Sequence, residues 1–195
     1  MPRPNQSEER RAELIGIVAD AFAEVGYRRA TTAELARRCG VQENILYRLW
    51  PDKRAMFIAS LEHVFEVSAR MWNGCLEGAD GDSRTSAERL LSYESEHHGE
   101  FGLYRVIHAA LSEGDDPEIG AALRRMYERY QAFVSERVVE HQAERGVGPL
   151  PPALVAWALM GVGTMAGVAR ELGMMSPDQL AEFWERVGRA LLGES

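Results

Sequence analysis

Two short amphipathic segments meet at a glycine near the start of this chain, and this feature restricts the fold more than any other. Residues 31–39 and 42–49 each have the length of a two-turn helix, and Gly40 permits a sharp turn between them. Thr31 and Glu34 stand three residues apart, which is typical of a helix N-terminus. Residues 8–25 precede them as an amphipathic helix that begins after Ser7 and stops at Gly26. Two short helices joined by such a turn and supported by a third form a helix-turn-helix.

The rest of the sequence also predicts helices. Apolar residues recur at helical spacing, and no run alternates between β-branched and polar residues. We expect further helices over residues 53–76, 85–98, 100–113, 118–145, 152–172 and 177–192. The predicted fold is therefore all-α with about nine helices. A chain of 195 residues can form one large domain or two small ones.

Charge is distributed unevenly along the chain. Residues 1–54 carry ten Lys and Arg against eight Asp and Glu, a net charge of +2. Residues 55–195 carry twelve against twenty-two, a net charge of −10. This asymmetry indicates one end that can face a polyanion and an acidic remainder that repels it.

The outer face of the 42–49 helix carries side chains that suit DNA. Gln and Asn side chains pair with adenine, Arg pairs with guanine, and Glu can accept a hydrogen bond from the cytosine amino group. Tyr and Lys bind phosphate, and a helix N-terminus favours an anion. The predicted contact residues are Gln42, Glu43, Asn44, Tyr47, Arg48 and Lys53. Arg10, Arg11, Arg28 and Arg38 can add salt-dependent contacts.

The stretch "GYRRATTAELARRCGV…LYRLWPDKRAMF" resembles the N-terminal DNA-binding domain of the TetR family of transcriptional regulators. The resemblance covers about residues 10–60. Where family members usually have Ser, a variable residue, a small residue and then Thr or Ser, this chain has Gln42 to Ile45. We therefore expect an operator that differs from those of relatives. The matching positions are Gly26, Tyr27, Thr31, Leu35, Ala36, Gly40, Val41, Leu46, Tyr47, Trp50 and Lys53.

The resemblance implies both an architecture and a function. Residues 1–54 would form the helix-turn-helix DNA-binding domain, and residues 55–195 a larger helical domain for ligand binding and dimerisation. Thr31, Tyr47 and Lys53 would contact phosphate. The protein would be a homodimeric repressor on a double-stranded, pseudo-palindromic operator, released by a small hydrophobic or aromatic effector.

The acidic part offers candidates for the other two roles. The expected effector residues are aromatic, Met or His side chains at helical spacing, a pattern that core packing also produces. They are Met71, Trp72, Phe101, Tyr104, His108, Met126, Tyr130 and Trp157. The expected dimer interface lies on the last two helices. Its residues are Trp157, Gly161, Met165, Leu180, Phe183, Trp184, Val187 and Leu191.

Other classes of function are disfavoured. No nucleophile motif, phosphate-binding glycine loop or pair of catalytic carboxylates stands out, so we expect no enzyme, cofactor or metal. Glu94, His97 and His98 are interpreted as a polar surface patch rather than a metal site. The uncharged run 153–169 is shorter than a membrane span needs. The polar start of the chain, and two cysteines without metal-ligand spacing, favour the cytoplasm. A helical binding protein that has lost DNA affinity remains the alternative, and a small helical enzyme a more distant one.

Overall fold

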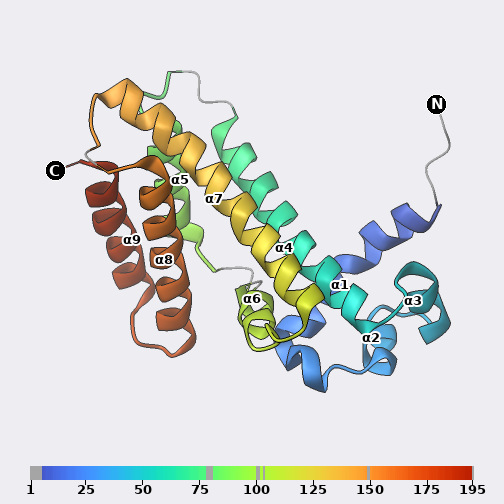
Figure 1. Ribbon diagram of the computed structural model, residues 1–195. Helices are drawn as coiled ribbons and strands as arrows, with labels where there is room; N and C mark the ends of the chain where they lie inside the picture. Colours follow the sequence, from blue (N-terminus) through green and yellow to red (C-terminus); the bar gives the residue numbers. More distant parts are fainter. Residues whose placement is uncertain (1–5, 78–80, 100–101, 103, 149, 195) are drawn as a thin grey trace. The chain divides into compact units, whose positions relative to one another are not determined.

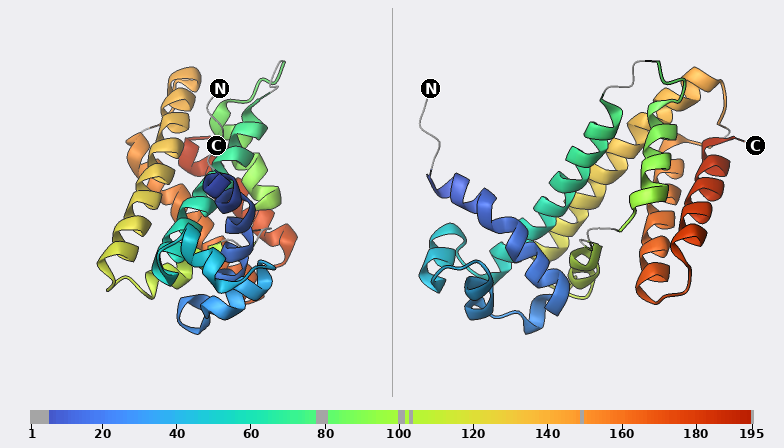
Figure 2. Two further views of the ribbon diagram at one scale, coloured as in Figure 1. Left: turned by 90° about the vertical axis from the view of Figure 1, so that its right-hand side faces the viewer. Right: turned by 180° about the vertical axis from the view of Figure 1, so that it is seen from behind.

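The computed structural model describes residues 6–77, 81–99, 102, 104–148 and 150–194. These residues form nine α-helices and no β-strand (Figure 1), so the predicted all-α fold is confirmed for them. Figure 2 shows the same helices from two further sides. The helices are α1 (Gln6–Arg29), α2 (Thr32–Arg38), α3 (Glu43–Leu49), α4 (Lys53–Leu76), α5 (Ser86–His97), α6 (Tyr104–Leu111), α7 (Pro117–Arg145), α8 (Pro152–Glu171) and α9 (Pro177–Leu192).

The predicted start and end signals of the first helices can be compared with their dihedral angles. Gly26 has a φ of 76° and interrupts α1, as expected, although one more turn follows to Arg29. Helix α1 begins at Gln6, so Ser7 lies inside its first turn and is not the N-cap that the sequence suggested. Thr31 caps α2 as predicted, because its side chain accepts a hydrogen bond from the Glu34 N–H. Gly40 adopts a φ of 65°, which only glycine takes without strain, and so permits the turn to α3.

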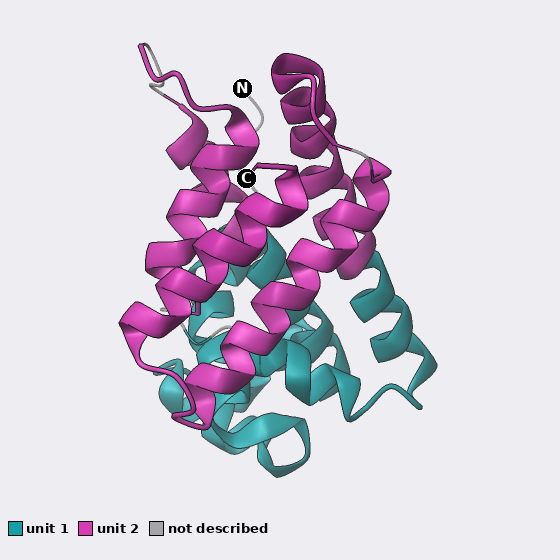
Figure 3. Ribbon diagram, turned by 90° about the vertical axis from the view of Figure 1, so that its left-hand side faces the viewer, with its two compact units in different colours: residues 1–67, 101–126 teal, residues 68–100, 127–195 magenta. Residues whose placement is uncertain are grey.

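The chain divides into two compact units (Figure 3). The first is drawn from residues 1–67 and 101–126, and α1 packs there against α2, α3 and α6. Phe22 of α1 and Phe57 of α4 are both fully buried, with ring centroids 5.0 Å apart in an edge-to-face arrangement. Leu35 of α2 and Leu46 of α3 are also fully buried, so both short helices are fixed by their apolar faces. Burying each of these side chains stabilises the unit by about 2 kcal/mol.

The second unit is drawn from residues 68–100 and 127–195, and α9 packs in it against both α5 and α8. Gly188 of α9 lies so close to α5 that an added Cβ would fall within 2.1 Å of a Leu91 methyl group. Gly163 of α8 likewise faces His98 and Trp184. Small residues therefore serve the packing inside this unit. Its core consists of Ala87, Leu91, Val138, Val155, Val162, Ala166, Ala169, Leu180, Trp184 and Leu192.

Candidate nucleic-acid interface

Helix α3 has one buried face and one exposed polar face. Leu46 and Leu49 are buried beneath it, at 0% and 5% exposure. Because these two side chains fix the rotation of the helix, the opposite face points to solvent. The residues that the sequence predicts for DNA contact on this helix, and the N-cap before it, are all exposed: Gln42, Glu43, Asn44, Tyr47 and Arg48.

A chain of hydrogen bonds connects this face to α2. The Tyr47 hydroxyl donates to Thr32 Oγ1 at 3.2 Å, and the Thr32 hydroxyl donates to Glu43 Oε2 at 2.7 Å. Thr32 is not among the residues predicted from the sequence. Its neighbour Thr31 has the N-cap position, and the phosphate contact is therefore assigned to Thr31. Thr31 itself is exposed, and its oxygen accepts the Glu34 N–H at 3.2 Å, which leaves its hydroxyl proton available.

The ammonium group of Lys53 forms two hydrogen bonds within the first unit. Its ammonium group donates to the carbonyl oxygens of Tyr27 and Ala30, each at 3.1 Å, and lies 4.6 Å from the centroid of the Tyr27 ring. An ammonium has three N–H donors, so at most one remains for a phosphate. Lys53 therefore connects the start of α4 to the end of α1, where the last carbonyls of a helix lack partners.

Most of the arginines expected to face DNA are paired within the unit. Arg10 pairs with Glu13 at 2.7 Å, and Arg28 pairs with Glu113 at 2.7 Å. Arg11 donates to the Leu49 carbonyl at 2.7 Å, and Arg38 contacts both Glu24 and Glu34. Arg48 of α3 is exposed and forms no ion pair with any residue that the structure describes.

Glu34 and Cys39 have altered proton affinities with clear causes. Hydrogen bonds from Arg37 and Arg38 lower the pKa of Glu34 to about 2, so this carboxylate stays ionised and offsets their charge. Burial raises the pKa of the Cys39 thiol, because the thiolate would lose its hydration. A thiol with a raised pKa is a poor nucleophile, which favours a packing role for Cys39.

The residues predicted to contact an effector lie in both units. Within the second unit, the Trp72 ring packs against Tyr130 at 5.4 Å and against Phe133 at 5.1 Å between centroids, and Met71 is half-buried. Trp157, in the same unit, is 53% exposed. Within the first unit, Tyr104 and His108 have ring centroids 5.8 Å apart, and Met126 is buried. Phe101 lies outside the described residues.

The Trp72 side chain is the first member of a polar chain that reaches α8. Its indole N–H donates to Glu94 Oε1 at 2.6 Å, and the other carboxylate oxygen lies 2.6 Å from His98 Nδ1. His98 Nε2 lies 2.7 Å from the Gly163 carbonyl oxygen. His97 instead stacks on Tyr93 and contacts the Tyr93 carbonyl oxygen, so it takes no part in this chain. Glu94 and His98 thus connect α5 with α8.

Helix α8 leaves an apolar stripe exposed. Leu154, Trp157 and Met165 are 57%, 53% and 58% exposed, and Gly161, which is also exposed, lies between them on the same face. By length and composition alone this helix could cross a membrane, and 39% of its most apolar window is buried. One such helix among the described residues is weak evidence for a span.

The expected interface residues of α9 lie differently. Leu180 and Trp184 are buried inside the second unit, whereas Phe183, Val187 and Leu191 are only partly covered. The face of α9 that carries Leu180 and Trp184 therefore packs within the unit itself.

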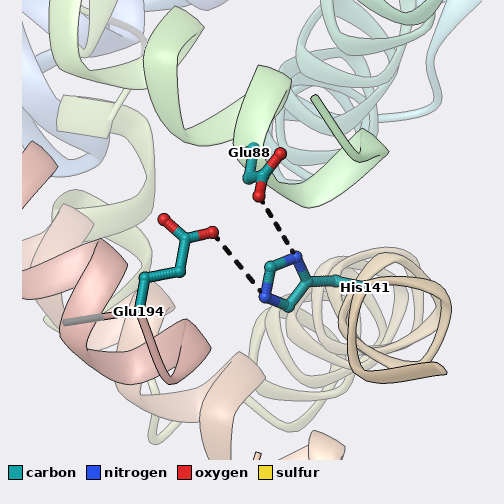
Figure 4. Close-up of side chains that lie close together, drawn as sticks. All are labelled: Glu88, His141 and Glu194. Carbon is teal, nitrogen blue, oxygen red and sulfur yellow. Dashed lines mark ion pairs between the residues drawn. The ribbon is translucent and has the colours of Figure 1, made fainter. Parts of the chain in front are cut away.

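Another cluster joins α5, α7 and the residues after α9. His141 is fully buried between the carboxylates of Glu88 and Glu194, 3.9 Å from the first and 3.8 Å from the second (Figure 4). Both ring nitrogens have hydrogen-bond partners, Thr85 Oγ1 at 2.9 Å and the Leu192 carbonyl oxygen at 3.2 Å. The ligand atoms of the three side chains all lie within 4.8 Å of one another, and both nitrogens of the His141 ring are already engaged by Thr85 and Leu192. The geometry therefore favours a structural joint over a metal site.

The pKa values of the two carboxyl groups beside His141 are shifted in opposite directions. Desolvation acts to raise the pKa of Glu88, but hydrogen bonds from Arg145 and from the Thr85 N–H outweigh it and lower this pKa to about 2. Desolvation and the neighbouring Glu88 raise the pKa of Glu194. A charged cavity of about 200 Å³ adjoins the joint, and no described residue of the predicted effector set lines it. Its lining residues are Arg84, Glu88, Leu91, Ser92, Arg145, Glu185, Arg189 and Glu194.

Known proteins resemble this chain in sequence and in fold. Residues 19–60 match the family described as "Bacterial regulatory proteins, tetR family". The nucleoid occlusion factor SlmA of Photobacterium profundum is 27% identical over 168 residues, 80% of this chain and 81% of that protein. The crystal structure of a TetR-family transcriptional regulator from a Rhodococcus species matches 95% of this chain and 99% of its own, with a TM-score of 0.80 and 18% identity. The regulator FadR of Bacillus halodurans matches 94% of this chain and 95% of its own, with a TM-score of 0.74 and 14% identity.

Proposed function

The chain belongs to the TetR family of transcriptional regulators, and we propose on that premise that it is a homodimeric, effector-released repressor. Its operator is a double-stranded, pseudo-palindromic DNA site with half-sites about one helical turn apart. The observation that carries this proposal is the exposed polar face of α3, held outward by buried Leu46 and Leu49. We retain the functional division at residue 54, with DNA binding before it and effector binding and dimerisation after it.

Each residue of the DNA face receives a role from its chemistry. Gln42 and Asn44 pair with adenine, and Arg48 pairs with the O6 and N7 atoms of guanine. Arg48 suits this role because its guanidinium forms no described ion pair. Thr31 and Tyr47 donate hydroxyl protons to phosphate, and Lys53 contributes its remaining N–H.

The exposed stripe of α8 supports the homodimer. One helix-turn-helix reads too few base pairs for useful specificity, so two copies must bind together. Leu154, Trp157 and Met165 form a continuous apolar face that a second copy would cover, with Gly161 permitting close approach. On α9 the partly covered Phe183, Val187 and Leu191 extend this interface, and Leu180 and Trp184 support it from within the unit.

The aromatic cluster around Trp72 supports a hydrophobic or aromatic effector. Trp72 and Tyr130 supply flat apolar surfaces, and Glu94 offers an acceptor beside them. An effector that displaces Trp72 from Glu94 also alters the contact of His98 with the Gly163 carbonyl of α8. Release from DNA requires the effector to bind one conformer of the dimer more tightly than the other.

Fluorescence anisotropy with labelled fragments from upstream of its own gene tests DNA binding. Arg48→Ala should weaken binding by about tenfold or more, whereas Arg124→Ala, an exposed arginine of α7, should change it little. If no fragment binds at low salt, the protein is a helical binding protein without DNA affinity, and the proposal fails.

Effector binding is tested separately with the aromatic probe 1-anilinonaphthalene-8-sulfonate. Trp72→Leu should weaken probe binding by about tenfold, whereas Leu111→Ala, which alters an exposed leucine of the first unit, should not. A probe affinity unchanged by Trp72→Leu removes this cluster from the effector site.

A further inference from the structure

The carboxylate of Glu43 occupies a hydrogen-bond donor that DNA would need, the Thr32 hydroxyl. The Thr32 hydroxyl gives its proton to Glu43 Oε2 at 2.7 Å, and the Tyr47 hydroxyl gives its proton to Thr32 Oγ1 at 3.2 Å. A hydroxyl has one proton to donate, so both donors are engaged within the unit. The acceptor at the end of this chain is an anion on the DNA-facing side of α3.

We propose that Glu43 is a specificity-determining residue whose carboxylate takes the place of a DNA phosphate on the Thr32 hydroxyl until a suitable base engages that carboxylate. The inference rests on the proposed function and adds one residue, Thr32, to its DNA contacts. It explains why an acidic side chain stands in the DNA-facing helix of this chain.

The physical reason is competition between two anions for the same donors. A hydrogen bond to a charged carboxylate is short and about twice as strong as one between neutral groups. A phosphate of arbitrary DNA must replace that bond and also approach the negative charge of Glu43. Glu43 therefore lowers the affinity of the protein for DNA that lacks a matching base pair.

A matching base pair removes this penalty. The amino groups of cytosine and adenine point into the major groove and can donate to a carboxylate. When Glu43 accepts from such an amino group, it releases the Thr32 hydroxyl, which can then donate to phosphate. Glu43 thus weakens nonspecific binding more than operator binding, and the ratio between the two affinities rises.

A double-mutant cycle on the full-length protein tests this competition. The variants are Glu43→Ala, Thr32→Val, and the two combined, with Glu43→Gln to remove the charge while keeping an acceptor. The probe is a random-sequence duplex, and the readout is anisotropy between about 50 and 200 mM salt. Glu62→Ala, an exposed acidic residue of α4, is the control for the same change in net charge.

The inference predicts a particular pattern of affinities. Glu43→Ala should bind random DNA about tenfold more tightly, and Glu43→Gln should gain less. Thr32→Val alone should change little, because its donor is already engaged. In the Glu43→Ala background, Thr32→Val should remove most of the gain in affinity for random DNA.

Four outcomes overturn the inference. If Glu43→Ala strengthens binding to random DNA by the same factor in the wild-type and the Thr32→Val backgrounds, the carboxylate acts only by repulsion through space. If Glu62→Ala gains as much as Glu43→Ala, net charge alone is responsible. If the wild type binds random DNA and Glu43→Ala binds no more tightly, Glu43 does not compete with phosphate, although the proposed function stands. A complete lack of binding by every variant overturns the proposed function together with the inference.

Discussion

Lys53 and Tyr27 are joined twice, by a 3.1 Å hydrogen bond to the Tyr27 carbonyl oxygen and by an ammonium group 4.6 Å from the Tyr27 ring centroid. The same ammonium group also donates a hydrogen bond to the Ala30 carbonyl oxygen at 3.1 Å. The one lysine of the sequence therefore stabilises the packing of α4 against the end of α1.

Lys53→Met should lower the free energy of unfolding of the protein by about 1–2 kcal/mol, because two carbonyls and one ring lose their partner. Urea denaturation measures this change. Arg48→Met removes an equal charge from an exposed position and should stay within about 0.5 kcal/mol of the wild type. Equal stabilities for the two variants would show that Lys53 has no such structural role.

Gly188→Ala should destabilise the second unit by about 1–3 kcal/mol, because the new methyl group would meet Leu91 at 2.1 Å. Thermal unfolding followed by circular dichroism measures this loss. Gly74→Ala in α4, also in the second unit, is the matched comparison, since an added Cβ there meets no atom within 4 Å inside the chain. A Gly188→Ala protein as stable as the wild type would mean that α5 and α9 pack less closely than described.

Met165→Glu should convert the proposed dimer to a monomer at micromolar concentration, because it places a charge in the centre of the apolar stripe of α8. Analytical ultracentrifugation measures the mass. Leu111→Glu, which changes a leucine that is 54% exposed in the first unit, should leave the mass unchanged. A Met165→Glu dimer of undiminished affinity would place the interface elsewhere.

Acid should destabilise the joint at His141 in a defined pH range. Glu88 has its pKa lowered to about 2, so the stability it contributes is complete above its unfolded pKa near 4.5 and is lost as the pH falls toward 2. Glu88→Gln should therefore flatten the pH dependence of the melting temperature over this range.

Glu194 should show the opposite sign. Its pKa is raised, so its ionised form costs stability at neutral pH and nothing at low pH. Glu194→Gln should be more stable than the wild type at pH 7, with the difference disappearing in acid. Melting curves between about pH 3 and 7 test both variants, and a Glu194→Gln protein less stable at pH 7 would contradict the assignment.

Local signals in the sequence predict much of this fold. The Thr31 cap, the positive φ of Gly40 and the helical spacing of apolar residues each depend on neighbours within a few positions. The exposed face of α3 follows from the same pattern. These features place the candidate DNA contacts Gln42 to Arg48 without knowledge of the tertiary structure.

Contacts between helices could not be predicted in this way. Thr32 is important because two helices place it between Glu43 and Tyr47, and no spacing rule reports that meeting. The apolar pattern of α9 likewise identifies a face with Leu180 and Trp184 but not what covers it, and α5 and α8 cover it within the unit. The pairing of Lys53 with Tyr27 depends on the same kind of tertiary contact.

Selection of bound sequences from random double-stranded DNA by the full-length protein tests the central claim most directly. The account predicts enrichment of a pseudo-palindrome with half-sites about one helical turn apart, and loss of a guanine preference at one position of each half-site when Arg48 is changed to Ala. Enrichment of no sequence by the wild-type protein, or an enriched motif that Arg48→Ala leaves intact, would contradict the assignment of α3 as the DNA-reading helix.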